Sequence, residues 1–178
     1  MTTKNKDKEK DKKNEKEKNQ IKIKVVVSEK DFSIDSEYDF LSRNAPRTGA
    51  IVSFVGRVRE FSEREDITGL HLEHYPGMTE ASLNKIIQQA HQRWDIQACS
   101  LHHRIGSLQV EDQIVYVGIS CAHRDEAFDA CRFIMDYLKT EAPFWKKELT
   151  QDGDYWVDAR EKDQQARARW QSSASDQS

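Results

Sequence analysis

Positively charged side chains recur in this chain at points where strands and helices are predicted to begin or end. The residues concerned are Arg57, Arg59, His123, Arg124, Lys139, Lys146 and Lys147. Ligands of α/β proteins tend to bind at such element ends, and free backbone N–H groups at a helix start bind anions. Each cation alone has an ordinary explanation, such as a surface ion pair or a lysine that complements a helix dipole. Together they predict a pocket for an anion, and the pattern by itself carries the inference no further.

Cysteine and histidine offer a second possible chemistry. Cys121 lies two residues before His123, and in a strand the two side chains would share a face, so a thiol enzyme based on Cys121 is an alternative. The three cysteines form no CxxC pair, and their odd number does not indicate a disulfide framework. His71 and His74 lie three apart in a strand-like run and would point to opposite faces. With no HExxH motif present, we expect a protein without a metal.

The amino-acid composition limits the class of protein. The 178 residues, of which 37% are hydrophobic, suit one domain with a real core. Residues 1–19 contain 8 Lys against 5 Asp and Glu and nothing apolar after Met1, so we expect 1–20 to be a disordered Lys-rich tail and the Ser-rich 171–178 to be a second one. The remaining 20 basic and 26 acidic residues make the body acidic, which argues against a nucleic-acid partner. No stretch approaches the length of a membrane span, and the tail lacks the apolar core of a signal peptide, so we expect a soluble, cytoplasmic protein with no membrane partner.

Hydrophobic periodicity predicts the elements that must position the cations. Apolar runs predict strands at 21–27, 50–58, 70–75, 98–105 and 113–121, and a DGD turn predicts a closing hairpin of 144–149 and 155–159. Helical spacing predicts a short helix at 36–41, a longer one at 79–94, and a third from about Asp125 to Lys139 that ends before Pro143. The class is therefore α/β or α+β, although the pattern does not give the strand order.

Three local features of these elements can also be predicted. Thr79 and Asp125 are expected to cap the two longer helices. Phe128 is assigned to the apolar stripe of the third helix. Gly56 lies where a β-bulge or a close backbone approach would fit.

Several longer runs resemble one known family. They are FVGRVR (Phe54 to Arg59), LEHYPGMTE (Leu72 to Glu80), HRIG (His103 to Gly106), AHRDEAFDACRFIMDYLKTEAPFWKKE (Ala122 to Glu148) and WVDAR (Trp156 to Arg160). In this order they resemble the large, catalytic subunit of molybdopterin synthase. The resemblance extends from about Ile21 to Trp170 and is weakest from Glu60 to Thr68.

The resemblance implies a fold, a reaction and partners. The fold is an α/β hammerhead-like domain with an added antiparallel β subdomain, over residues 21–170. The reaction is sulfur transfer to cyclic pyranopterin monophosphate, which forms the dithiolene of molybdopterin in molybdenum cofactor biosynthesis. The sulfur donor is the C-terminal Gly-Gly thiocarboxylate of a small ubiquitin-like subunit. Two large subunits form a homodimer, and with two small subunits they form a heterotetramer that needs no metal.

The resemblance also implies which residues form the site. Lys139 and Lys146 are the expected catalytic residues. The expected substrate-binding residues are Arg57, Val58, Arg59, His123, Arg124, Lys139, Lys146, Lys147 and Glu148. Such a cationic site suits the chemistry because the substrate phosphate and the thiocarboxylate are both anions, and arginine donates two parallel hydrogen bonds to phosphate.

Two alternatives remain beside the thiol enzyme. A scaffold could keep the fold without catalysis, although it would not need all four of the residues His123, Arg124, Lys139 and Lys146. A nucleic-acid-binding module would use the Lys-rich tail. The role of that tail, the identity of the small subunit, the order of the two sulfur transfers and a covalent intermediate at Lys139 are not determined by the sequence.

Overall fold

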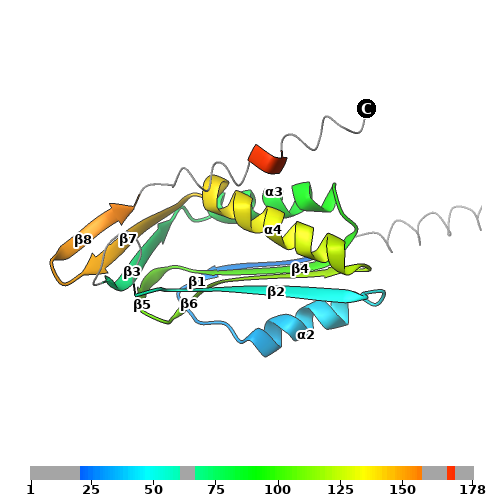
Figure 1. Cartoon of the computed structure of the whole chain (residues 1–178), viewed down its shortest axis with the longest axis horizontal. Helices are drawn as coiled ribbons and strands as arrows, with labels where there is room; N and C mark the ends of the chain where they lie inside the picture. Colours follow the sequence, from blue (N-terminus) through cyan, green and yellow to red (C-terminus); the bar gives the residue numbers. More distant parts are fainter. Residues whose placement is uncertain (1–20, 61–66, 158–167, 171–178) are drawn as a thin grey trace, which may run out of the picture.

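Two four-stranded sheets and three helices of at least eleven residues make up the part of the chain that the structure describes, residues 21–60, 67–157 and 168–170. Figure 1 shows this computed structural model, in which the first sheet lies between helices and the second sheet extends from one end of it. The tails expected at 1–20 and 171–178 lie outside the described residues.

The first sheet is mixed. Its strands are β1 (Lys22–Ser28), β2 (Ala50–Arg57), β4 (Ile96–Arg104) and β6 (Gln113–Cys121). They lie in the order β1-β4-β6-β2, with β1 parallel to β4 and the other pairs antiparallel. The β2–β6 register shifts between Gly56 and Arg57, which confirms the bulge predicted at Gly56. β1 and β2 therefore form the two edges of this sheet.

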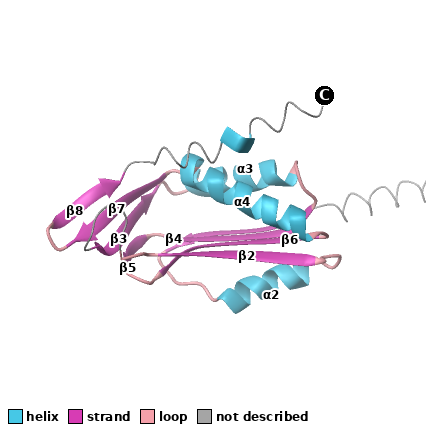
Figure 2. Cartoon of the chain, viewed as in Figure 1, coloured by secondary structure: helices cyan, strands magenta, loops and turns pink. Residues whose placement is uncertain are grey.

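Helices cover both faces of the first sheet. They are α2 (Ile34–Asn44), α3 (Met78–His91) and α4 (Arg124–Glu141). α3 and α4 lie on one face and α2 lies alone on the other, as both cartoons show (Figures 1 and 2). The larger core lies under α3 and α4, where Leu83, Ile86 and Ile134 pack on Leu101 and Ile119 of the sheet. A smaller core under α2 contains Leu41 and Tyr116, both with no exposed surface.

The second sheet is wholly antiparallel. Its strands are β3 (Ile67–His74), β5 (Gly106–Gln109), β7 (Phe144–Thr150) and β8 (Gly153–Val157), in the order β5-β3-β7-β8. β5 follows β4 after a single residue, Ile105, so the chain passes directly from the first sheet into the second. This sheet is the added antiparallel β subdomain, and the predicted α+β class is confirmed.

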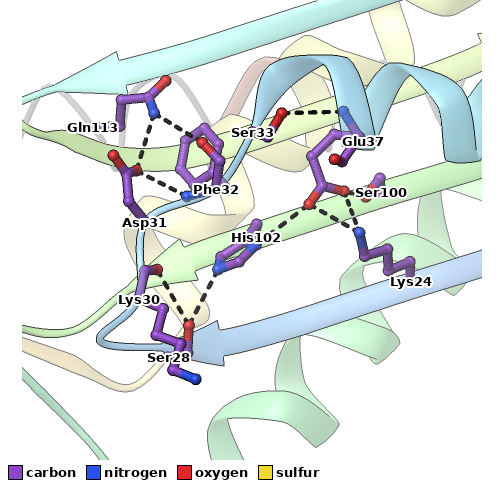
Figure 3. A network of polar contacts seen from close by, with 11 residues as sticks. Lys24, Ser28, Lys30, Asp31, Phe32, Ser33, Glu37, Ser100, His102 and Gln113 are labelled. Atoms are coloured by element: carbon purple, nitrogen blue, oxygen red, sulfur yellow. Dashed lines mark hydrogen bonds and ion pairs between the residues drawn. The ribbon is translucent and has the colours of Figure 1, made fainter.

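A buried polar network fixes α2 to the sheet (Figure 3). The carboxylate of Glu37 on α2 is 3% exposed and accepts hydrogen bonds from Lys24 Nζ of β1 at 2.9 and 2.8 Å. Ser100 of β4 donates its hydroxyl to the same carboxylate, and Nδ1 of His102 lies 3.4 Å from it. Burial raises the pKa of Glu37, but Lys24, Ser100 and His102 outweigh burial and hold this pKa below its usual value. Glu37 is therefore an ionised group that joins the helix to two strands.

Three local predictions were wrong. α3 begins earlier than expected, so its N-cap is Gly77, whose N–H donates to Glu80 Oε2 at 2.7 Å. Thr79 is instead buried inside the first turn, where its hydroxyl accepts from the N–H of Tyr75. α4 likewise has its N-cap at His123, which leaves Asp125 in the first turn. Phe128 is 58% exposed and does not belong to the buried face of α4.

The last described residues pack back onto the helices. Trp170 makes edge contacts with Trp94 and Phe133, and its indole N–H donates to Asp136 Oδ2 at 2.9 Å. The chain thus returns from β8 to the α3–α4 layer (Figure 1). None of the helices in the described ranges is both long and apolar enough to cross a membrane.

Candidate active site

The residues predicted to form one site lie at two opposite ends of the first sheet. Ala50 pairs with Cys121, so His123 and Arg124 follow the end at which β2 begins. Arg57 pairs with Gln113 at the other end, seven strand residues away, which corresponds to about 23 Å. Arg124 and Lys139 are likewise separated along α4 by fifteen residues, or about 22 Å. A single chain therefore does not bring all the predicted residues together.

Lys146 lies near the end of the first sheet that joins the second sheet, and its side chain projects from the inner face of β7. Its ammonium contacts Glu148 Oε1 at 3.1 Å, and its side chain is one-third exposed. Glu148 is 3% exposed. Leu72 and Leu70 of β3 lie directly opposite Lys146 and Glu148, and directly opposed residues of an antiparallel pair share one face. The ammonium can therefore reach solvent, whereas the carboxylate lies within an apolar wall.

Phe144 extends the same face toward the first sheet. It lies two residues before Lys146, and its ring stacks on His103 of β4 with the ring centroids 3.9 Å apart. His103 is 5% exposed, and burial lowers the pKa of His103 to about 4. The neutral ring donates from Nδ1 to the carbonyl oxygen of Arg104 at 2.8 Å. His103 is thus a neutral packing partner near neutral pH and supports the wall beside Lys146.

Lys139 and Lys146 flank the junction at which α4 passes into β7. Lys139 lies in the last turn of α4 and is exposed, and Ala142 ends the helix before Pro143. Two cations at a helix–strand junction create a local positive field next to solvent, which suits an anionic ligand.

The three residues from Arg57 to Arg59 have different environments. The side chain of Arg57 is half exposed, and its Nε donates to the carbonyl oxygen of Glu111 at 2.7 Å. Val58 is 3% exposed and packs with Leu70, Leu72 and Leu108 on the inner face of the second sheet. Arg59 is exposed. The side chain of Val58 is therefore not available to a ligand. Its N–H donates to the carbonyl oxygen of Asp112 and its carbonyl oxygen accepts from the N–H of Glu111, both at 2.9 Å, so its predicted contact with the substrate has no support from this geometry.

Lys147 points away from Lys146 and Glu148, because neighbouring strand residues alternate between faces. Its ammonium lies 3.8 Å from Asp154 Oδ2 and 4.9 Å from the ring centroid of Trp156. These partners place Lys147 on the outer face of the hairpin. Within one chain, its predicted role in substrate binding has no support from its side-chain direction.

His123 and Arg124 begin α4 at the far end of the first sheet. Both are exposed, and Arg124 Nε lies 3.5 Å from Asp125 Oδ1. His123 makes no capping hydrogen bond through its side chain. Both side chains, together with the N–H groups of the helix start, are therefore available to a group outside the chain.

The cysteines are poor nucleophiles in this fold. Burial raises the pKa of both Cys121 and Cys131 to about 12, and it also raises the pKa of Cys99. All three thiols are buried. Because the thiolate is the reactive form, the arrangement does not favour the thiol enzyme based on Cys121.

Two features of the site region were not predicted from the sequence pattern. The first is the His103–Phe144 stack, which joins residues forty-one positions apart, so that no local pattern could reveal it. The second is a line of polar groups in which Ser28 Oγ lies 3.2 Å from His102 Nε2 and His102 Nδ1 lies 3.4 Å from Glu37. Lys24 engages both oxygens of that carboxylate, so we assign this line to the attachment of α2. Among residues 21–60, 67–157 and 168–170, no group of three or more His, Cys, Asp or Glu residues could hold a metal ion, and an enzyme without a metal stays a prediction.

The fold and the site together define a class of protein, namely an α+β protein with a cationic site suited to anionic substrates. A family model described as MoaE protein matches residues 27–141. A relative from Vibrio cholerae, the molybdopterin synthase catalytic subunit, is 53% identical over 145 residues, which are 82% of this chain and 96% of the relative. The chain belongs to the MoaE family, and the family resemblance predicted from the sequence is confirmed.

Solved structures agree with this assignment. The molybdopterin biosynthesis MoaE protein from Burkholderia ambifaria has a TM-score of 0.73 and 47% identity, over 84% of this chain and 98% of that one. A chain from the complex of subunits 1 and 2 of molybdopterin-converting factor from Helicobacter pylori has a TM-score of 0.62 over 78% of this chain and 91% of that one. Its 18% identity supports the fold alone.

Proposed function

We propose that this chain is the catalytic, sulfur-transferring subunit of a molybdopterin synthase and acts in molybdenum cofactor biosynthesis. Its substrate is cyclic pyranopterin monophosphate, and its sulfur donor is the C-terminal thiocarboxylate of a small ubiquitin-like subunit. The observation that carries this proposal is the pair Lys139 and Lys146 at the α4–β7 junction of a chain that is 53% identical to a catalytic subunit. No metal or cofactor enters the proposal, and we expect the enzyme to act in the cytoplasm.

The chemistry requires two anions to approach each other. The thiocarboxylate sulfur attacks a side-chain carbon of the precursor, and a C–O bond of that carbon breaks as the C–S bond forms. In one of the two transfers this opens the cyclic phosphate, which keeps the oxygen, and in the other the oxygen leaves as water. The sulfur meanwhile stays bonded to the acyl carbon of the tail. Water then attacks that acyl carbon, the acyl–sulfur bond breaks, and the tail leaves as a carboxylate while the product keeps the sulfur. Lys139 stabilises the negative charge that develops on the acyl oxygen, and Lys146 supports the same charge. Arg57 and Arg59, from the adjacent end of β2, hold the phosphate.

A second copy of the chain is needed to complete this site. His123 and Arg124 lie about 22 Å along α4 from Lys139, which is too far for one bound substrate to contact both groups. The edge strand β2 contacts α4, which carries the exposed Phe128. A twofold, antiparallel approach of two chains through these elements would place the start of one α4 beside the end of the other. The expected homodimer, with a small subunit at each site, then forms the heterotetramer.

Two alternatives receive less support. The thiol enzyme would need a reactive Cys121, but burial raises the pKa of that thiol to about 12. A non-catalytic scaffold would have no reason to keep a partly exposed ammonium held by a buried carboxylate, as Lys146 and Glu148 are.

A single-turnover assay tests the function. The purified protein is mixed with cyclic pyranopterin monophosphate and the thiocarboxylated small subunit, and dithiolene product is measured. We expect product from the wild type and a loss of about a hundredfold to a thousandfold in rate for Lys139→Ala. Lys85→Ala, which changes an exposed lysine on α3, is the matched control and should keep the wild-type rate. Absence of product from the wild type, with a partner subunit verified to carry the thiocarboxylate, would refute the proposed function.

A mixing experiment tests the shared site. Lys139→Ala and Arg124→Ala are each expected to be nearly inactive as homodimers. After the two variants exchange subunits, half of the dimers are mixed and one of the two sites in each is wild type, so about a quarter of the activity should return. If mixing restores nothing although mixed dimers are present, the two residues do not act across a dimer.

A further inference from the structure

We propose that Glu148 is a positioning residue, which holds the ammonium of Lys146 at the reacting groups without touching the substrate itself. This inference rests on the proposed function and assigns Glu148 a different part in the site from the substrate contact that the family resemblance implies. It follows from the burial of the carboxylate, its distance from Lys146 and the surface on which both lie.

The two side chains differ in their access to solvent. Lys146 is one-third exposed, whereas Glu148 is 3% exposed, and the two polar groups are 3.1 Å apart. Because they are two residues apart in β7, both project from the same face of the strand. A ligand that arrives from solvent therefore meets the ammonium first, and the carboxylate lies behind it.

The surroundings of the pair are apolar. Leu70 lies directly opposite Glu148, and Leu72 lies directly opposite Lys146. Both leucines are at most 6% exposed and pack with Val58 and Leu108. An ion pair is stronger beside such a wall than in water, since the local dielectric constant is low. The carboxylate thus restricts a side chain that would otherwise sample many rotamers.

The charge of Glu148 also argues against direct binding. Both reactants are anions, so a carboxylate in contact with either would repel it. Behind Lys146, the same carboxylate is separated from the substrate by the cation that it holds. Its effect on the reaction then passes through the position of Lys146, and a displacement of about 1 Å at a reacting group can lower a rate about a hundredfold.

Glu148→Gln keeps the shape of the side chain but removes its charge. We expect kcat to fall about thirtyfold to a hundredfold, while KM for the pterin precursor changes less than about threefold because the substrate contacts remain. Glu148→Asp keeps the charge on a shorter side chain, and we expect it to recover part of the lost kcat. Glu73→Gln is the matched control, since Glu73 lies on the neighbouring strand, is 54% exposed and pairs with Trp145 on the outer face.

A double-mutant cycle separates positioning from a merely structural role. With Lys146→Ala as the background, the further change Glu148→Gln should leave the residual kcat unchanged, because the group that Glu148 positions is gone. All rates are measured per folded protein, with the folded fraction taken from circular dichroism at the assay temperature. A structural role would lower the folded fraction equally in both backgrounds and leave kcat per folded protein intact.

Three outcomes are distinguishable. A fall in kcat for Glu148→Gln that disappears in the Lys146→Ala background supports the inference. An equal fall in both backgrounds, or no fall in kcat per folded protein, overturns it while the wild type remains active. A wild type that forms no product overturns the proposed function itself.

Discussion

Replacing Lys24 with methionine should destabilise the protein in a way that depends on pH. Lys24 Nζ contacts both oxygens of Glu37, which is 3% exposed and lies under α2 (Figure 3). Methionine has a similar length and no charge, so the variant keeps much of the packing but leaves the carboxylate without its cation. Removing one partner of a fully buried ion pair costs about 3–5 kcal/mol.

The expected loss of stability is smaller than this for the Lys24–Glu37 pair. Lys24 is one-third exposed, so solvent screens part of the attraction, and Ser100 still donates to the carboxylate. We therefore expect a loss of about 2 kcal/mol at neutral pH. For a domain of this size, that loss lowers the melting temperature by about 4–8 °C.

The pH dependence follows from the pKa of Glu37. In the wild type this pKa lies below its usual value of 4.5, so the stabilising contribution is present above about pH 4.5 and is lost as the pH falls through the pKa of the folded state. Without Lys24, burial is the main remaining influence and raises the pKa of Glu37. The carboxyl of the variant then becomes neutral at a higher pH, so the difference between variant and wild type should shrink as the solution is acidified.

Thermal unfolding followed by circular dichroism at pH 7 and pH 4 measures both effects. Lys22→Met is the matched control, because Lys22 lies on the same strand and is exposed. A melting temperature of Lys24→Met within about 1 °C of that control at pH 7 would refute the reasoning. A difference in melting temperature between Lys24→Met and the wild type that grows on acidification would also refute it.

Three further predictions concern other parts of the fold. As the pH falls from about 6.5 to 4, the free energy of unfolding of the wild type should decrease by up to about 3 kcal/mol relative to that of His103→Gln, because the pKa of His103 is about 4 in the folded state and the unfolded chain binds the proton first. Urea unfolding that gives both proteins the same dependence of this free energy on pH would contradict the prediction. The thiols of Cys99, Cys121 and Cys131 should not react with iodoacetamide in the folded protein at pH 7.5, since burial raises the pKa of each; mass spectrometry that finds rapid native labelling would refute their buried state. Gly118→Ala should lower the free energy of unfolding by about 1–3 kcal/mol, because the added methyl carbon would lie 2.5 Å from Leu41 Cδ1 and 2.6 Å from a ring carbon of Tyr116. An unchanged urea midpoint would contradict this and show that α2 can move away.

Local sequence patterns predicted most elements of the fold. The strands at β1, β2 and β6, the closing hairpin and the end of α4 before Pro143 agree with the structure within a few residues. These predictions hold because alternation, helical spacing and turn residues reflect the conformation of neighbouring residues. The caps at Thr79 and Asp125 were wrong because each helix begins before the residue that pattern alone selects. The strand predicted at 98–105 ended at the boundary with the second sheet, but β5 was not predicted, because a strand of four residues is too short for a clear alternating pattern.

The sequence by itself determined the family, the α+β class and the cations that a site for anions would use, because these depend on residue types and on short-range spacing. Only the tertiary structure decided that Glu148 lies behind Lys146, that Val58 is buried, and that Arg57 lies at the opposite end of the first sheet from the end that leads to Arg124. Strand order and burial arise from contacts between residues far apart in the chain, such as the parallel pairing of β1 with β4. These contacts are selected by the packing of whole faces against each other, and no local spacing records them.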